Sequence, residues 1–223
     1  MKRLRPIAIV GVVLSLGWLM FPFAEPKEPS YQGRRLSEWI TDYETGVSGV
    51  IIGQKRVEVM RSARHAVKAI GTNAIPTLLQ WLQATNSPKK VTLNKLLDKQ
   101  SLIHFRFRGA GDWQLMAAEG FNLLGNDAEP AVPALTQLLG SEDKNLWARV
   151  WDCFFLIEQD KKILSPIILQ LLHNQNVNIR FGAADYLSKV HKDEAEKAGI
   201  YKMFPELKPP TTNTLETNSP AAK

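Results

Sequence analysis

The sequence predicts an all-α protein, a solenoid of about four helical hairpins with an N-terminal capping helix and one inserted helix. Residues 63–79 and 117–135 carry the same phrase: an Ala-rich amphipathic run, a Gly, a short turn, an Ala, a Pro and a Leu-rich second run. A helix–turn–helix unit that recurs along a chain indicates a repeat array. The spacing agrees, because Pro133 and Pro166 stand about 33 residues apart, within the usual range of helical repeats.

The composition fits one medium-sized domain and gives only a weak electrostatic signal. The chain has 223 residues, of which 44% are hydrophobic, enough for a continuous core. The net charge is +6, and Lys2, Arg3 and Arg5 supply three of these charges. The surplus that remains is a weak argument for nucleic acid as a partner. Cys153 is the only cysteine, which excludes an intramolecular disulfide, and its aromatic helical setting predicts a buried, unreactive thiol.

Residues 1–24 are expected to be a signal peptide or an N-terminal membrane anchor. Three cations precede a charge-free apolar run at 7–23, which as a helix would span roughly 25 Å, somewhat short of a ~30 Å hydrocarbon core. Two outcomes stay open: an uncleaved anchor, and a signal cleaved after Ala24, for which Pro22 at the −3 position is unfavourable. The cations stay in the cytoplasm. The rest of the chain is therefore expected in the cell envelope, anchored to the inner membrane, or secreted if cleaved near Ala24.

The next segments lead into the repeats. Residues 25–34 read as a Pro-rich linker, and residues 35–44 as a short helix with an apolar stripe at the i, i+3, i+4, i+7 spacing. We expect this helix to cover the open end of the first repeat. Residues 45–56 contain three glycines and predict a loop. At the other end of the chain, residues 208–223 are polar and are expected to be disordered.

Between these segments lies the expected repeat domain, 35–207. Its repeats fall at about 57–86, 112–141, 143–174 and 177–207, with an insertion at 87–111 that carries its own helix over 92–100. Within the repeats we expect helix 57–70 with 74–85, 112–124 with 129–139, 143–158 with 162–173, and 177–190 with 193–204. Gly71 and Gly125 are expected to end first helices, Gly71 as a residue that tolerates left-handed geometry. Asp112 and Asn176 are expected N-caps.

Two phrases resemble the first helix of a HEAT repeat. They are Val-Asn-Ile-Arg-Phe-Gly-Ala-Ala-Asp-Tyr-Leu at 177–187 and Val-Met-Arg-Ser-Ala-Arg-His-Ala at 59–66. With the lead-in from Tyr31 to Trp39 and the apolar N-terminal segment, the chain is similar to bacterial envelope-associated HEAT-repeat proteins over about 31–207. The resemblance implies a right-handed, armadillo-like α-α superhelix whose second helices line the concave side.

The resemblance also implies a ladder of arginines. In the family, an Arg near the start of each first helix ties to an acidic residue in a neighbouring turn, and Arg61, Arg149 and Arg180 match that position. Leu115 occupies it in the second repeat, which interrupts the ladder. HEAT arrays serve as scaffolds for many partners, so the resemblance is nearly silent on function.

Three glutamines recur at one position of the second helices. Gln80, Gln137 and Gln170 each follow the Pro of their repeat by four residues. One interpretation is a polar ladder along the concave groove, with Trp81 and Gln83 beside Gln80, that binds a protein partner. The other is that this position merely faces solvent or bridges neighbouring repeats.

The insertion contains a basic and aromatic stretch within residues 89–108. Arg106 and Arg108 alternate with Phe105 and Phe107, a pattern typical of a short extended segment that buries its two rings. The alternative is that the cations bind an anionic membrane surface. Nucleic acid suits an exported chain less well.

Enzyme chemistry finds little support among the motifs. None of the four histidines stands in a His-Glu-x-x-His arrangement, and no Gly-x-Ser-x-Gly or phosphate loop occurs. We therefore expect no catalytic residue, metal ligand, cofactor or small-molecule substrate. The sequence favours a non-catalytic protein–protein interaction scaffold and leaves the partner open. The alternative is an accessory domain that binds an anionic membrane surface through residues 89–108, and residues 7–23 would add a membrane contact if uncleaved.

Overall fold

The computed structural model describes residues 27–98, 107–157 and 164–209, except for the side chain of Lys90. In these ranges the protein is all-α, as the repeats predict. The α-helices are α2 (Leu36–Val47), α3 (Gly53–Ile70), α4 (Ile75–Leu82), α5 (Pro88–Leu97), α6 (Ala110–Leu124), α7 (Val132–Leu138), α8 (Lys144–Ile157), α9 (Leu164–Leu171), α10 (Val177–Val190), α11 (Lys192–Lys197) and α12 (Ile200–Met203). The remaining elements are the 3-10 helices η2 (Gly71–Ala74), η3 (Gly125–Ala131) and η4 (Pro205–Leu207), and two short antiparallel strands, β1 (Ser30–Tyr31) and β2 (Arg34–Arg35).

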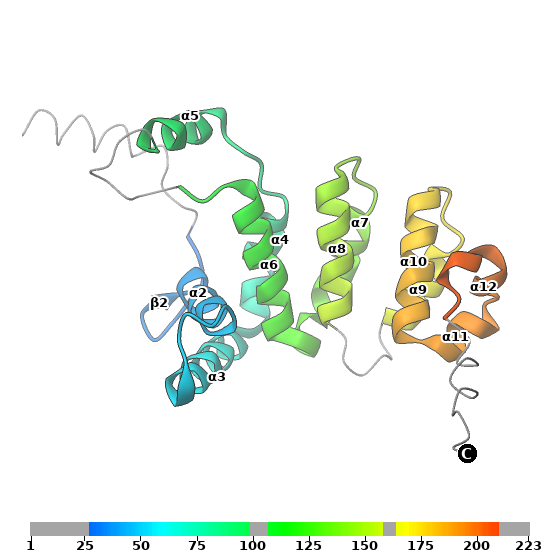
Figure 1. Cartoon of the computed structure of the whole chain (residues 1–223), viewed down its shortest axis with the longest axis horizontal. Coiled ribbons are helices and arrows are strands. Elements are labelled where there is room, and N and C mark those ends of the chain that lie inside the picture. Colours follow the sequence, from blue (N-terminus) through cyan, green and yellow to red (C-terminus); the bar gives the residue numbers. More distant parts are fainter. Residues whose placement is uncertain (1–26, 99–106, 158–163, 210–223) are drawn as a thin grey trace, which may run out of the picture.

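The helices form an extended row of pairs. Figure 1 shows α4 behind α6, α7 behind α8 and α9 with α10, while α2 and α3 lie at one end of the row and α11 and α12 at the other. The second helix of one expected repeat packs on the first helix of the next, as α4 does on α6, α7 on α8 and α9 on α10. Consecutive first helices also pack directly on each other, and α6 does so extensively on α8.

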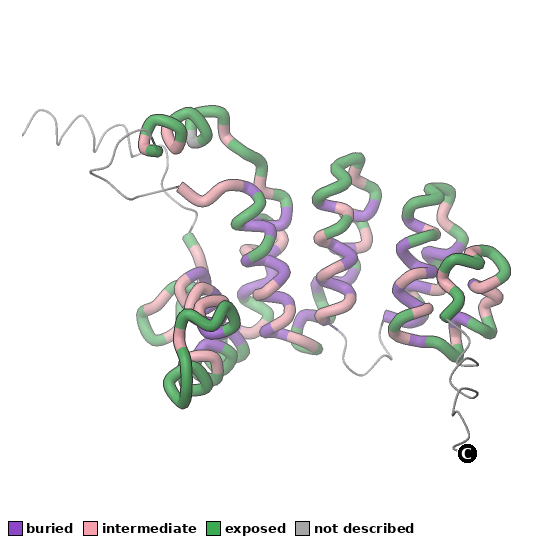
Figure 2. Tube along the Cα trace, viewed as in Figure 1, coloured by how far each residue is buried: buried purple, intermediate pink, exposed green. Residues whose placement is uncertain are grey.

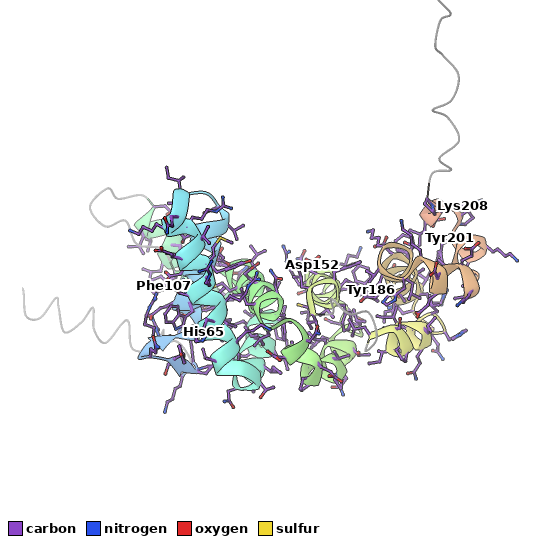
Figure 3. The ribbon with its side chains drawn as sticks, turned by 90° about the horizontal axis from the view of Figure 1, so that it is seen from below. His65, Phe107, Asp152, Tyr186, Tyr201 and Lys208 are labelled. Atoms are coloured by element: carbon purple, nitrogen blue, oxygen red, sulfur yellow. The ribbon has the colours of Figure 1, made fainter. Side chains whose placement is uncertain are left out.

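Two layers run along this row. The first helices α6, α8 and α10 lie in one layer, and the second helices α4, α7 and α9 lie in the other (Figure 3). In the same view α3 crosses the level of both layers, and its N-terminal end projects on the side of α6, α8 and α10, as do α11 and α12 at the other end of the row. The row is thus hollowed on the side of the first helices. The expectation that second helices line the inner side does not hold for this chain.

The core lies between the two layers. Buried positions alternate with exposed ones along the helices of the row, as an amphipathic helix requires, whereas no described residue of α5 is buried (Figure 2). The largest fully buried side chains include Leu78, Leu82, Phe121, Leu135, Phe154, Leu164 and Tyr186. The helices approach closely at Gly120 of α6, where a Cβ would lie 2.4 Å from Cδ2 of Leu78 in α4. A side chain at this position would push α4 and α6 apart.

Residues 25–34 are not the simple linker that we expected. Within their described part, β1 and β2 pair across a tight turn in which Gln32 and Gly33 both have positive φ. Tyr31 fastens this ribbon to the helices, because its carbonyl oxygen accepts a hydrogen bond from Trp39 Nε1 at 3.2 Å. The lead-in segment is therefore part of the folded end of the row.

Several helix ends confirm the sequence prediction. Gly71 and Gly125 follow α3 and α6 with φ of 61° and 55°, values that favour glycine. Asn176 is the N-cap of α10, and its Oδ1 accepts a hydrogen bond from the N–H of Asn178 at 2.9 Å.

Other boundaries differ. α6 begins at Ala110, before the expected N-cap Asp112. Asp112 is instead the third residue of the helix, and its carboxylate accepts a hydrogen bond from the Gly109 N–H at 2.8 Å. The loop expected at 45–56 comprises only residues 48–52. α2 extends to Val47, and α3 begins at Gly53, before the first residue of the predicted helix. Gly199, with φ of 70°, separates α11 from α12 where one helix was expected.

None of the described helices is both long and apolar enough to cross a membrane. Residues 7–23, on which the anchor prediction rests, lie outside the described residues, and so does the tail from 210 to 223.

Candidate functional site on the face of α6, α8 and α10

A shallow, open depression of about 540 Å³ lies across the face that three first helices share. Hereafter the α6–α8–α10 surface denotes its lining residues, which are Leu115, Ala118, Glu119, Arg149, Asp152, Phe155, Leu156 and Lys189. Asp152 marks the position in Figure 3, on the side toward which the ends of the row project. Because the three helices are far apart in sequence, the surface exists only when the row is assembled.

Part of this surface is apolar. Leu115 of α6 is 48% exposed, although it is a large aliphatic side chain. Phe155 of α8 is half-buried, and its ring packs on that of Tyr186 with centroids 5.0 Å apart. Leu156 is likewise half-buried. Covering such side chains releases roughly 25 cal/mol for each Å² of apolar area removed from water.

Charged side chains of both signs line the same surface. Arg149 Nη1 donates to Asp152 Oδ2 at 3.0 Å, and Lys189 Nζ donates to Asp185 Oδ2 at 2.8 Å. The Lys189 ammonium also lies 5.6 Å from the centroid of the Phe155 ring. Exposed pairs of this kind contribute about 0–1 kcal/mol to stability. These ion pairs can therefore be replaced by ion pairs to a bound partner with little loss of folding stability.

An acidic corner borders the surface on the side of α2. Burial raises the pKa of Glu44, and the nearby carboxylates of Glu119 and Asp112 raise it further, while the Arg108 guanidinium opposes the shift. Arg108 also donates to Thr41 Oγ1 at 3.0 Å. Carboxylates therefore outnumber the one guanidinium that acts on Glu44 at this end of the surface.

The three predicted glutamines lie in the other layer. Gln80 belongs to α4, Gln137 to α7 and Gln170 to α9, and all three are exposed. Their shared exposure agrees with their equivalent positions in the sequence. They do not line the hollow, because the hollow lies on the side of the first helices.

Trp81 and Gln83, the two residues proposed beside Gln80, differ in burial. Trp81 is only 3% exposed, and its ring packs on Trp113 of α6 with centroids 5.0 Å apart. It is a core residue, so the prediction that it contacts a partner is corrected. Gln83 is exposed, and its Nε2 donates to the carbonyl oxygen of Leu79 one turn earlier.

The described part of the insertion is fastened to the body of the protein. The Arg108 guanidinium lies 5.2 Å from the centroid of the Trp113 ring, in addition to its bond with α2. The Phe107 N–H donates to Asn94 Oδ1 at 2.9 Å, and Asn94 Nδ2 donates back to the Phe107 carbonyl at the same distance. Arg108 is thus a structural cation. Arg106, the other predicted contact, lies outside the described residues.

The arginine ladder implied by the resemblance is not formed as expected. Arg149 pairs with Asp152 of its own helix. Arg180 donates to the carbonyl oxygens of Asn174 and Gln175, at 2.8 and 2.9 Å, in the turn before its own helix. Each arginine stabilises its own helix or turn, and in neither case is the partner an acidic residue of a neighbouring turn.

Ser165, His191 and Glu194 form a largely buried polar cluster. The sequence did not indicate it, because Ser165 is far from the other two in the chain. Ser165 Oγ donates to the Glu194 carboxylate and lies 3.3 Å from Nδ1 of His191. In a nucleophilic triad the serine hydroxyl donates to the histidine. Here the hydroxyl donates to the carboxylate, so the cluster fastens α9 to α10 and α11.

The single cysteine is a core residue. Cys153 is fully buried in α8, and burial raises the pKa of its thiol well above the ordinary value. Among the described residues, no group of His, Cys, Asp and Glu side chains is arranged to hold a metal ion.

Comparisons of the chain with protein-family models, with curated proteins and with solved structures found no match.

Proposed function

We propose that this protein is a non-catalytic protein–protein interaction scaffold, built as a HEAT-like α-solenoid, and that its partner binds in the hollow at the α6–α8–α10 surface. The solenoid architecture is supported by the repeated Gly and Pro punctuation and by helices that follow one another in two layers. A row of this kind offers an extended face to a partner.

The observation that carries the binding site is a surface that combines exposed apolar side chains with charges of both signs. Leu115 is exposed, Phe155 is held by its packing on Tyr186, and Glu119, Arg149, Asp152 and Lys189 line the same surface. Protein-binding sites commonly place apolar anchors at the centre and polar groups at the edge. An amphipathic helix or an extended segment of a partner protein fits this arrangement.

The layer with Gln80, Gln137 and Gln170 is the competing location. Its exposed glutamines offer hydrogen bonds, but the neighbouring Trp81 and Leu82 are buried. Burial of apolar surface is the larger contribution to association. We therefore place the partner on the side of the first helices.

The cellular location follows from the N-terminal segment. Three cations ahead of the apolar run at 7–23 support export, with the repeats in the envelope and the partner among envelope proteins. The alternative function, in which residues 89–108 bind an anionic membrane, has less support. Arg108 is engaged with Thr41 and Trp113 rather than turned to a surface.

The proposal is tested by Leu115→Glu, with Gln137→Glu as the matched control. Both positions are exposed on helices, so the same acidic side chain is tolerated by the fold, which circular dichroism checks. A protein that co-purifies stoichiometrically with the wild-type chain from the native envelope should be lost from Leu115→Glu and retained by Gln137→Glu. Retention by the first variant and loss from the second would place the partner on the glutamine layer instead.

A further inference from the structure

The turn between α2 and α3, together with the helix ends that flank it, exposes four aliphatic side chains. The members are Val47 at 52%, Val50 at 77%, Ile52 at 80% and Val57 at 52% exposed. Hereafter these four residues are the aliphatic tip. Figure 2 shows the turn as largely exposed, at the end of the row that carries α2 and α3. Scattered apolar residues on a surface are ordinary, but a cluster on one turn marks an interaction site.

The backbone holds this tip away from the core. Gly49 and Gly53 have φ of 77° and 67°, conformations that favour glycine, and a Cβ at either position would meet no atom within 4 Å. The chain thus bends at two glycines and presents the intervening residues outward. Val50 and Ile52 are consequently far more exposed than the aliphatic residues of α2 itself, such as Leu36 and Ile40.

Exposed cations follow the turn along α3. Lys55, Arg56 and Arg61 of α3 are exposed, against one exposed carboxylate, Glu58. Within the described ranges, no carboxylate forms an ion pair with any of the three cations, whereas Lys68, further along the same helix, pairs with Asp127. The charge beside the tip is therefore available to an anionic partner.

We propose that the aliphatic tip and the cations Lys55, Arg56 and Arg61 form a docking surface for an anionic lipid bilayer. Aliphatic side chains enter the boundary between headgroups and acyl chains, and cations at the same level bind anionic headgroups. A protein partner is favoured less, because protein-binding hot spots are rich in Trp and Tyr, and the tip has neither. This surface is separate from the α6–α8–α10 surface and does not depend on a partner there.

The buried Cys153 makes a direct test possible, because added cysteines can be labelled while it stays unreactive. The full chain carrying Ile52→Cys is labelled with an environment-sensitive bimane and reconstituted into phosphatidylcholine vesicles that contain spin-labelled lipid quencher, with or without phosphatidylglycerol. Val177→Cys is the matched control, since Val177 is also an exposed aliphatic residue, at 55%. Leu96→Cys, in α5, reports on the insertion. The quenching reports the depth of the labelled residue in the bilayer. It therefore does not depend on whether the N-terminal segment anchors the chain to the vesicle.

The expected result is quenching of the label at position 52 in vesicles with phosphatidylglycerol and its loss in 0.5 M salt, because salt screens exposed charges. Lys55→Glu combined with Arg56→Glu should abolish the quenching, and the label at position 177 should stay in water. Three results would overturn the proposal. They are a label at 52 that behaves like the one at 177, quenching at 96 in place of 52, and burial of the label at 52 that rises with protein concentration without vesicles, which would indicate a second copy.

Discussion

Trp151 of α8 lies directly against the backbone of α10 at Gly182. A Cβ on residue 182 would stand 2.4 Å from Cε2 of the indole and 2.5 Å from its Nε1. The ring has little room to retreat, because Phe154 and Tyr186 pack around it with centroids 5.5 and 6.5 Å away. This contact therefore sets the spacing between α8 and α10, two of the three helices that form the α6–α8–α10 surface.

We predict that Gly182→Ala destabilises the protein, because the added methyl overpacks a rigid site. Overpacking of this kind costs about 1–3 kcal/mol. The matched control is Gly111→Ala in α6, where a Cβ would meet nothing within 4 Å. That variant should gain up to about 1 kcal/mol from the better helix propensity of alanine. Urea denaturation of both variants checks the pair, and equal stabilities would refute the close contact.

Glu44 and Glu38 lie on the same helix with opposite pKa shifts. Burial, with Glu119 nearby, raises the pKa of Glu44, whereas the N–H and guanidinium of Arg35 lower that of Glu38. For Glu44 the folded state keeps its proton longer than the unfolded chain, so stability falls as pH rises from the ordinary value of 4.5 toward the raised pKa. For Glu38 stability is present above 4.5 and falls as pH drops through the lowered pKa.

Glu44→Gln should therefore stabilise the protein at pH 7, with a gain that disappears below pH 4.5. Glu38→Gln should destabilise it at pH 7, with a loss that shrinks on acidification. Thermal unfolding from pH 3 to pH 8 measures both curves. A loss of stability in Glu44→Gln at neutral pH would mean that this carboxylate is favourably paired, contrary to the acidic corner described above.

Cys153 should resist thiol reagents in the folded protein and react once the chain unfolds. Burial raises its pKa, so the folded state holds the proton at a pH where the unfolded chain, with an ordinary pKa of 9.0, releases it. Stability should therefore fall as pH rises above 9, by up to about 1.4 kcal/mol per pH unit. Cys153→Ala lacks this contribution, so the stability difference between it and the wild type should narrow above pH 9. Rapid labelling of the native thiol at pH 8 would contradict its burial.

Asn176→Ala should cost about 1 kcal/mol, because it removes the acceptor that caps α10. Asn176→Asp keeps a side-chain acceptor at the same position and should retain most of the stability. Chemical denaturation separates the two variants. Equal losses would show that the side-chain oxygen is not what matters at this helix end.

Local sequence signals predicted the helices well, because their causes are local. Gly71 and Gly125 end helices through backbone conformation, and Asn176 caps α10 through a bond two residues away. Glycine at 199 had the same capacity, but the surrounding apolar pattern concealed the break that it makes between α11 and α12.

The candidate site was harder to predict because it depends on packing between distant segments. The spacing of Gln80, Gln137 and Gln170 correctly identifies an equivalent exposed position, yet it carries no information about which layer faces the hollow. Trp81 illustrates the same limit, since its burial against Trp113 arises from the packing of α4 on α6. The polar cluster of Ser165 likewise forms only in three dimensions.

The location of the partner is tested most directly by photocrosslinking in the native cells. Benzoylphenylalanine would be placed at Leu115 or Leu156 on the α6–α8–α10 surface, and at Gln137 or Gln170 on the other layer, in the full chain. We expect a discrete crosslinked protein from positions 115 and 156 and none from positions 137 and 170. Crosslinks confined to the glutamine positions would contradict this expectation.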